Sequence, residues 1–156
     1  MRVCLIAVGS RLPAWVQTGF AEYAKRLPRE CRLELVEIPV EHRNRNADIS
    51  RLRKAEGERI LAAVPPRALV VALDERGKPW SSADLSRRLE DWMQEGHDVA
   101  LMVGGPDGLD SACLDRASLS WSLSALTLPH GLVRVMVAEQ VYRGWSMLRG
   151  HPYHRA

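Results

Sequence analysis

The C-terminal end of the chain carries residue types that readily contact a nucleic acid. No acid follows Glu139, and basic and aromatic side chains crowd the last seventeen positions: Arg143, Arg149, His151, Tyr153, His154 and Arg155. Arginines bind phosphates and a tyrosine stacks on bases, so this composition favours RNA contact. A frayed tail without function is the alternative.

His151 and His154 could also suggest a metal site. Their spacing of three residues resembles that of zinc ligands, but no third ligand lies nearby in the sequence. Pro152 between them disfavours a helix that would turn both imidazoles to one side. We therefore expect no metal at this end.

A second candidate is the loop Gly104-Gly105-Pro106-Asp107-Gly108. A glycine-rich loop after a strand can cradle a phosphate through its backbone N–H groups. This one lacks the GxGxxG spacing, no Walker loop is present, and Pro106 removes one donor. The glycines can equally be there only to turn the chain.

The third candidate is Ala125–Leu128, an apolar run that continues into a segment marked as a loop by Pro129 and Gly131. An apolar loop favours a pocket for a flat, hydrophobic ligand, although it can also simply seal the core. Before it, serines alternate with apolar residues from Ser120 to Ser124, which is typical of a strand with one buried face. A serine hydrolase is disfavoured because GxSxG is absent.

The elements that must position these loops alternate between strands and helices. Apolar runs predict strands at Val3–Val8, Leu33–Val40, Ala68–Leu73, Val99–Val103 and Ser120–Ser124. Helices are expected from Pro13, from an Asn46 cap to about Val64, from a Ser81–Asp84 capping box to Gly96, and after Pro129. We expect Asp74–Trp80 to be a loop.

This order predicts an α/β domain with a mainly parallel sheet flanked by helices. The runs at residues 68–73 and 99–103 are continuously apolar, as in strands covered on both faces. Ligands of such sheets bind outside the carboxyl ends of the strands, so the two loops can share one crevice.

Composition narrows the class of protein. A chain of 156 residues with 46% hydrophobic residues is expected to form a single domain, residues 1–156. The net charge of +3 gives weak support for an anionic partner, and Arg43 and Arg45 either contact nucleic acid or form a solvated face. Three cysteines without CxxC spacing, and no leader or membrane segment, indicate reduced thiols in a cytoplasmic protein.

With these loops in view, the sequence resembles the RlmH-type ribosomal RNA methyltransferases of the SPOUT superfamily. The resemblance covers essentially the whole chain. It is carried by AVGSRLPAWVQTGFAEYAKR, ALDERGKPWSS, LMVGGPDGL, WSLSALTLPHGLVRVMVAEQVYRGWS and HPYHR.

The resemblance implies a deep trefoil knot near the C-terminus, a homodimer and S-adenosyl-L-methionine as cofactor. Knot-helix residues Val135, Val141 and Trp145 are expected to give apolar surface to the second subunit. The cofactor positions that it implies are Leu73, Gly104, Leu123, Ser124, Ala125, Leu126, Thr127 and Leu128.

The resemblance also implies the reaction, which is methylation of N3 of a pseudouridine in 23S rRNA of the large subunit, on assembled ribosomes. It points to Arg143, Tyr153 and His154 around the target base. The roles are our inference: His154 could act as base or proton relay, Arg143 could stabilise the developing imide anion, and Tyr153 could stack on or orient the ring. Glu139 either orients Arg143 or forms a simple i,i+4 pair.

Two other functions stay open at this stage. One is a non-catalytic ribosome-binding factor with the same fold, and the other is a nucleotide-binding α/β enzyme of another kind. Binding of S-adenosyl-L-methionine rather than nucleotides would distinguish the methyltransferase from the other α/β enzyme. Methyl transfer to whole ribosomes would distinguish it from the ribosome-binding factor.

Overall fold

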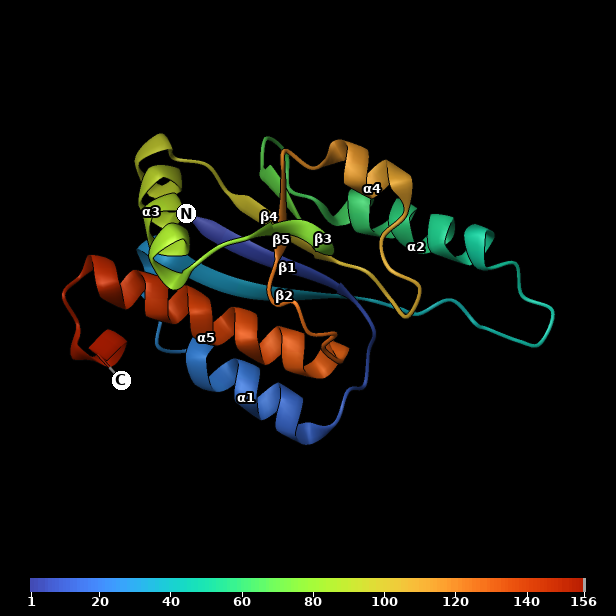
Figure 1. The fold of residues 1–156 in the computed structure, drawn as a ribbon, viewed down its shortest axis with the longest axis horizontal. Helices are drawn as coiled ribbons and strands as arrows, with labels where there is room; N and C mark the ends of the chain where they lie inside the picture. The colour runs from blue at the N-terminus through green and yellow to red at the C-terminus, as the bar shows by residue number, and fades with distance from the viewer. Residues whose placement is uncertain (156) are drawn as a thin grey trace.

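One five-stranded, all-parallel sheet forms the centre of the protein. The computed structural model describes residues 1–155. The strands are β1 (Arg2–Val8), β2 (Arg32–Ile38), β3 (Leu69–Pro79), β4 (Val99–Val103) and β5 (Leu119–Ser122). They lie in the order β2-β1-β4-β3-β5, with Leu5 opposite Leu101 and Leu101 opposite Val71 in the middle of the sheet (Figure 1). The expected parallel α/β architecture is therefore confirmed.

Helices cover both faces of this sheet (Figure 1). The first face carries α1 (Ala14–Ala24), α3 (Ser82–Glu95) and α5 (His130–Leu148), and the second carries α2 (Ile49–Ala63) and the short α4 (Ser111–Arg116). Two 3₁₀ turns, η1 (Arg29–Cys31) and η2 (Pro152–Arg155), complete the described residues.

Alternation along the central strands explains the two layers. Leu5 and Leu101 belong to the core under α1, α3 and α5, whereas Ile6 and Met102 belong to the core under α2 and α4. Every residue of β4 is buried, as the continuous apolar run predicts. The three cysteines are free and buried, in agreement with the expected reduced thiols.

Local signals in the sequence correctly predict both ends of α3, but not the start of α2. Ser81 and Asp84 form the expected capping box at α3, and Gly96 ends that helix with a φ of 75°. At α2 the expected cap is wrong, because the carboxylate of Asp48 accepts from the N–H of Arg51. Asn46 lies outside the helix, where its N–H donates to Asn44.

The largest difference concerns Asp74–Trp80, which the sequence suggests is a loop. Strand β3 continues to Pro79, with a register shift in which Trp121 pairs with both Leu73 and Lys78. Stacking of Trp80 on Trp121, with ring centroids 4.8 Å apart, holds the returning chain against β5. A long-range aromatic contact of this kind has no signature in local sequence. Strand β5 also ends at Ser122, two residues earlier than expected.

Candidate functional site

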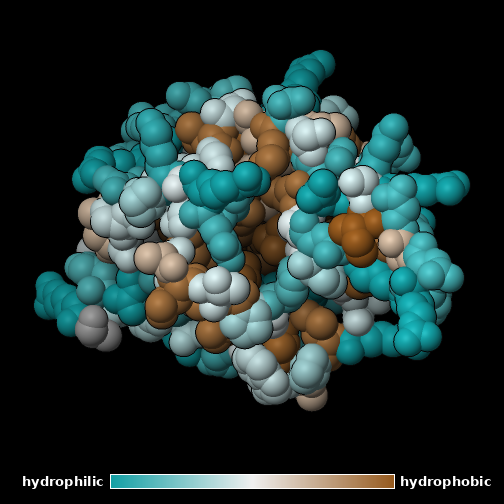
Figure 2. Space-filling view, turned by 45° about the vertical axis from the view of Figure 1, so that its right-hand side comes forward, coloured by the Kyte–Doolittle hydropathy of each residue, from teal (hydrophilic) through white to brown (hydrophobic). Residues whose placement is uncertain are grey.

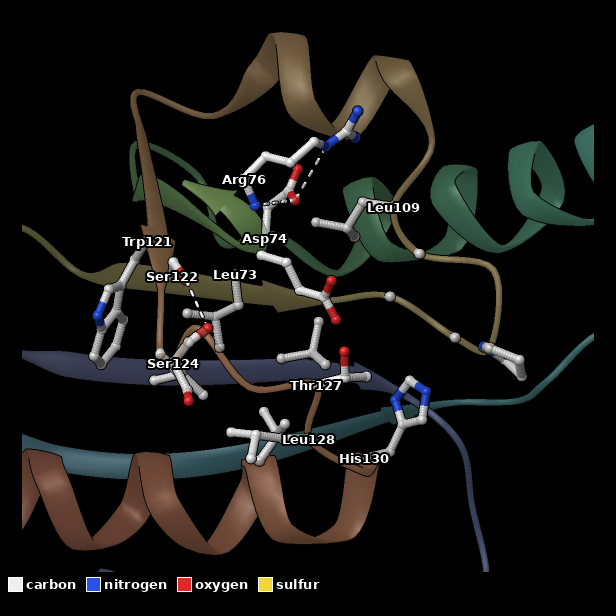
Figure 3. Close-up of a pocket in the computed structure, with 18 of the residues that line it drawn as sticks. Leu73, Asp74, Arg76, Leu109, Trp121, Ser122, Ser124, Thr127, Leu128 and His130 are labelled. Carbon is white, nitrogen blue, oxygen red and sulfur yellow. Dashed lines mark hydrogen bonds and ion pairs between the residues drawn. The ribbon is translucent and has the colours of Figure 1, made fainter. Parts of the chain in front are cut away.

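A cavity of about 460 Å³ opens at the carboxyl ends of β4 and β5, beside the middle of β3 where its register shifts. Its walls come from this part of β3, the β4–α4 loop, the β5–α5 loop and the first turns of α5, and side chains from these elements converge around one space (Figure 3). Figure 2 shows a hollow with a hydrophobic floor and a largely hydrophilic rim. The crevice shared by the two loops is where the sequence places it.

Most of the expected cofactor positions line this cavity. They are Leu73, Gly104, Leu123, Ser124, Leu126, Thr127 and Leu128. Ala125 is the exception and does not line it. Sequence reasoning missed the other lining side chains, among them Arg53, Asp74, Arg76, Leu109, Trp121 and His130. Asp74 and Arg76 could have been found from their position directly after the buried apolar run of β3.

The β4–α4 loop presents backbone to the cavity. A Cβ on Gly104 would lie 2.4 Å from the backbone carbon of Gly108, closer than real Cβ contacts, so glycine is required there. The N–H of Gly108 donates to the carbonyl of Gly105 at 3.0 Å, and Gly108 itself has a φ of 80°. The glycines do turn the chain, and the turn they form is also a wall of the cavity.

The β5–α5 loop forms the opposite wall. The hydroxyl of Ser122 donates to the carbonyl of Ser124 at 3.1 Å, and the hydroxyl of Ser124 accepts from the N–H of Leu126 at 2.9 Å. The side chain of Leu126 is 72% exposed, so this loop does not merely seal the core. Its serine hydroxyls fix the backbone and leave apolar side chains facing the opening.

Charges around the cavity are mixed rather than basic. The carboxylate of Asp74 accepts from the backbone N–H of Arg76 at 3.0 Å and pairs with its guanidinium. Burial lowers the pKa of His130, and the positive charge of Arg134 lowers it further, so its imidazole is neutral at pH 7. Such a surface differs from a phosphate cradle, which needs convergent positive charge and N–H donors.

Two residues expected to contact the target nucleobase, Arg143 and Tyr153, form a separate cluster towards the C-terminal end of α5. One oxygen of Glu139 accepts from Arg143 at 2.8 Å and from the hydroxyl of Tyr153 at 3.0 Å. The Arg143 guanidinium lies 5.1 Å from the ring centroid of Tyr153, which packs on Tyr142 at 4.7 Å. Glu139 therefore orients two side chains, which is more than a surface pair does.

The protonation of this cluster follows from its surroundings. Burial raises the pKa of Tyr153, and the neighbouring Glu139 carboxylate raises it further, so the phenol stays protonated. The pKa of Arg143 is raised by its hydrogen bond to Glu139. Nδ1 of His154 is buried, with no hydrogen-bond partner among the residues that the structure describes.

The tail itself is ordered against α5. Gly150 reverses the chain with a φ of 64°, the N–H of His151 donates to the carbonyl of Ser146 at 2.9 Å, and η2 follows. Residues 150–155 thus fold back as an ordered turn, and whether this end has a function stays a prediction. Within residues 1–155, no group of three or more His, Cys, Asp or Glu side chains is placed to hold a metal ion. No helix of the described chain is long and apolar enough to cross a membrane.

Within one chain, the cavity is separated from the cluster of Glu139, Arg143 and Tyr153, which we call the tail cluster. His130 lines the cavity at the start of α5, whereas Arg143, Tyr153 and His154 do not line it. Val133 of α5 also lines the cavity, and at a rise of 1.5 Å per residue the helix from Val133 to Arg143 spans roughly 15 Å. The structure thus brings Arg143 together with Tyr153, and separates both from the expected cofactor positions.

Comparison with known proteins identifies the family. Residues 1–154 match the family model described as "Predicted SPOUT methyltransferase". A protein of Thioalkalivibrio sulfidiphilus named "Ribosomal RNA large subunit methyltransferase H" is 63% identical over 155 residues, which cover 99% of both chains. Proteins of the same name from Nitrosococcus oceani and Methylococcus capsulatus are each 56% identical over at least 99% of both chains. The chain therefore belongs to the SPOUT methyltransferase family, as an RlmH-type member.

Proposed function

We propose that this protein is an S-adenosyl-L-methionine-dependent methyltransferase that acts on N3 of a pseudouridine in 23S rRNA, on assembled ribosomes. The observation that carries the proposal is the cavity between the β4–α4 and β5–α5 loops, in a chain whose relatives are named as ribosomal RNA methyltransferases. The substrate position and the assembled ribosome come from the family resemblance.

The cavity residues fit this cofactor. Its volume of about 460 Å³ is that of a small-molecule site. Leu73, Leu123 and Leu128 provide apolar surface for an adenine, and the Gly104–Gly108 backbone approaches closely because no side chain intervenes. The lack of convergent basic side chains suits a ligand without phosphates.

The chemistry divides between the two ends of α5. S-adenosyl-L-methionine supplies a methyl group activated by its positive sulfonium. With the cofactor bound, residues of the two loops would orient its methyl group towards the target nitrogen, and the apolar walls would exclude water. From the tail, His154 accepts the imide proton of the base, and from the tail cluster Arg143 stabilises the anion that remains. Tyr153, held by Glu139, stacks on or orients the ring.

A homodimer would bring these groups together, with the tail of one subunit beside the cavity of the other. We propose this arrangement because one chain leaves its half-sites roughly 15 Å apart along α5. The trefoil knot is proposed from the family resemblance alone. One expectation about the interface needs correction, because Val141 is buried in the core of the single chain. Trp145 and Val135 are half-buried, the first against that core and the second near Gly19 of α1, and their part in an interface stays a prediction.

Other apolar side chains are free for such an interface. Trp15 is 57% exposed and Leu132 is 36% exposed, at the neighbouring N-terminal ends of α1 and α5. A mass of two chains in light scattering is expected at working concentrations. A monomeric mass would contradict the dimer, and with it the shared site.

The decisive experiment uses ribosomes that lack the modification. The protein and S-adenosyl-L-methionine carrying a labelled methyl group are incubated with intact ribosomes, with separated large subunits and with free 23S rRNA. Mass spectrometry of the nucleosides should show N3-methylpseudouridine from intact ribosomes. Cofactor binding without transfer to any of the three would support a ribosome-binding factor instead. Preference for nucleotides in calorimetry would support the other α/β enzyme class.

A further inference from the structure

Arg43 lies behind the cavity wall, on the connection between β2 and α2. Its guanidinium donates through Nη1 and Nη2 to the two carboxylate oxygens of Glu56, at 2.9 and 3.0 Å. Its Nε donates to the carboxylate of Asp107 at 2.9 Å, and Nη1 also donates to the carbonyl of Glu41 at 3.0 Å. One side chain thereby joins α2, its own loop and the β4–α4 loop.

The residue of α2 that pairs with Arg43 is Glu56, an acid in a buried position. Glu56 is 2% exposed, and it also accepts from the backbone N–H of Glu41 at 3.0 Å. A buried carboxylate is tolerated only when it is paired and hydrogen-bonded, so Glu56 fixes the position of Arg43. Its oxygen also lies 3.0 Å from where a Cβ on Gly105 would be, directly against the glycine loop.

The connection to the cavity runs through Asp107. This residue lines the cavity, as do its neighbours Gly105 and Gly108, whereas Arg43 does not. Arg53, which lines the cavity too, donates to the carbonyl of Asp107 at 3.5 Å. The earlier hypothesis that Arg43 contacts nucleic acid is not supported, because all of these donors are directed inward.

We propose that Arg43 is a positioning residue for the cofactor cavity: by holding Asp107 from behind, it fixes the shape of the Gly104–Gly108 wall. The cofactor part of this inference rests on the proposed function, and the loop part does not. The planar guanidinium is needed because it reaches two carboxylates in fixed directions at once. A lysine supplies a single point of charge and can satisfy only one of them well.

The experiment compares Arg43→Lys with Arg59→Lys. Arg59 is a matched control because it pairs with Glu41 and donates to the Pro39 carbonyl of the same connection, without touching the glycine loop. In the free protein, backbone amides of the 105–109 segment should exchange hydrogen faster in Arg43→Lys than in Arg59→Lys. Calorimetry should show affinity for S-adenosyl-L-methionine about tenfold weaker in Arg43→Lys, the effect expected for one charge-assisted hydrogen bond.

A double-mutant cycle separates positioning from general stability. If Arg43 acts through Asp107, adding Arg43→Lys to an Asp107→Ala background should weaken binding little further, because the shared contact is already gone. Equal exchange and affinity in the two lysine variants would overturn the inference, and so would additive effects in the cycle. If the wild type does not bind the cofactor, the proposed cofactor fails, while the exchange comparison still tests the loop.

Discussion

The two ends of α5 carry the two parts of the proposed site and use their polar groups in different ways. At the His130 end, backbone and apolar side chains surround an open cavity, and the charges at its rim are balanced. At the Arg143 end, Glu139 accepts from both Arg143 and Tyr153, and aromatic rings pack around them. The His130 end therefore encloses a cavity, whereas the Arg143 end presents side chains that are held in place by hydrogen bonds and ring packing.

In the proposed function, this difference assigns the cofactor to one end of α5 and the RNA base to the other. A cofactor cavity needs enclosure, which the strand ends of a parallel sheet provide. A surface that receives a base on a large RNA needs exposed groups that are already oriented, which the hydrogen bonds to Glu139 provide. Because one helix separates the two, a second subunit must supply the missing half in our proposal.

The largest expected effect comes from closing the cavity at its backbone wall. In Gly104→Val, even the first side-chain carbon would collide with the backbone of Gly108, so the loop must deform. We expect no measurable cofactor binding in calorimetry, with cooperative unfolding retained because the central strands are untouched. Gly96→Ala serves as a control for a strained glycine replacement away from the cavity: its Cβ would meet nothing within 4 Å, and the strain of an alanine at a φ of 75° lies at the end of α3. Wild-type affinity in a folded Gly104→Val protein would refute the assignment.

Removing the tail should separate binding from transfer. A chain that ends at Pro152 loses Tyr153 and His154, and with them the hydroxyl that donates to Glu139. Affinity for S-adenosyl-L-methionine should stay within a few-fold of the wild type, because these residues do not line the cavity. Single-turnover methylation of ribosomes should fall at least ~100-fold, as expected when proton transfer and base positioning are lost. Normal methylation by the truncated protein would return the tail to a structural role.

Mixing these two defective proteins tests whether the site spans two subunits. Each mixed dimer would pair the intact cavity of the truncated chain with the intact tail of the Gly104→Val chain. With random subunit exchange, activity should recover to about a quarter of the wild type, since half the dimers are mixed and each holds one complete site. Mixed dimers made by co-expression with two affinity tags would allow the measurement. No recovery would show that the cavity and tail act within one chain.

Sequence reasoning reached the cavity because its signals are local. The buried run Val99–Val103 and the apolar loop before Pro129 predict a strand end and a following helix, and parallel strands bring such ends together. The glycine loop could be placed for the same reason. The requirement for glycine at position 104, however, depends on the close approach of Gly108, which only the structure reveals.

What the sequence missed depends on contacts between distant residues. Arg43 and Asp107 are 64 positions apart, and nothing around Arg43 distinguishes it from a solvated arginine. The extension of β3 depends on Trp80 stacking on Trp121 in the same way. The knot and the cofactor entered through the family resemblance alone, because periodicity carries no information on either.

The smallest expected effect is a pH dependence that belongs to the cavity end. Burial, and then the charge of Arg134, lowers the pKa of His130 below its ordinary value of 6.5 in the folded chain. As the pH falls through 6.5, the unfolded chain therefore binds a proton at this position before the folded chain does. The free energy of unfolding should decrease over that window and then level off once both states are protonated. The contribution is present above pH 6.5 and lost below it.

Urea unfolding at several pH values between 8 and 5 measures this effect. The decrease should be smaller in His130→Gln than in the wild type, because glutamine does not titrate. His97→Gln removes an imidazole that is 46% exposed and pairs with Glu95 far along the chain from the cavity, so it should keep the His130 contribution. An identical pH profile for the wild type and His130→Gln would show that His130 is hydrated in solution. Water would then reach the cavity at the start of α5 more freely than its lining residues suggest. The two ends of the helix would differ less in their enclosure from solvent.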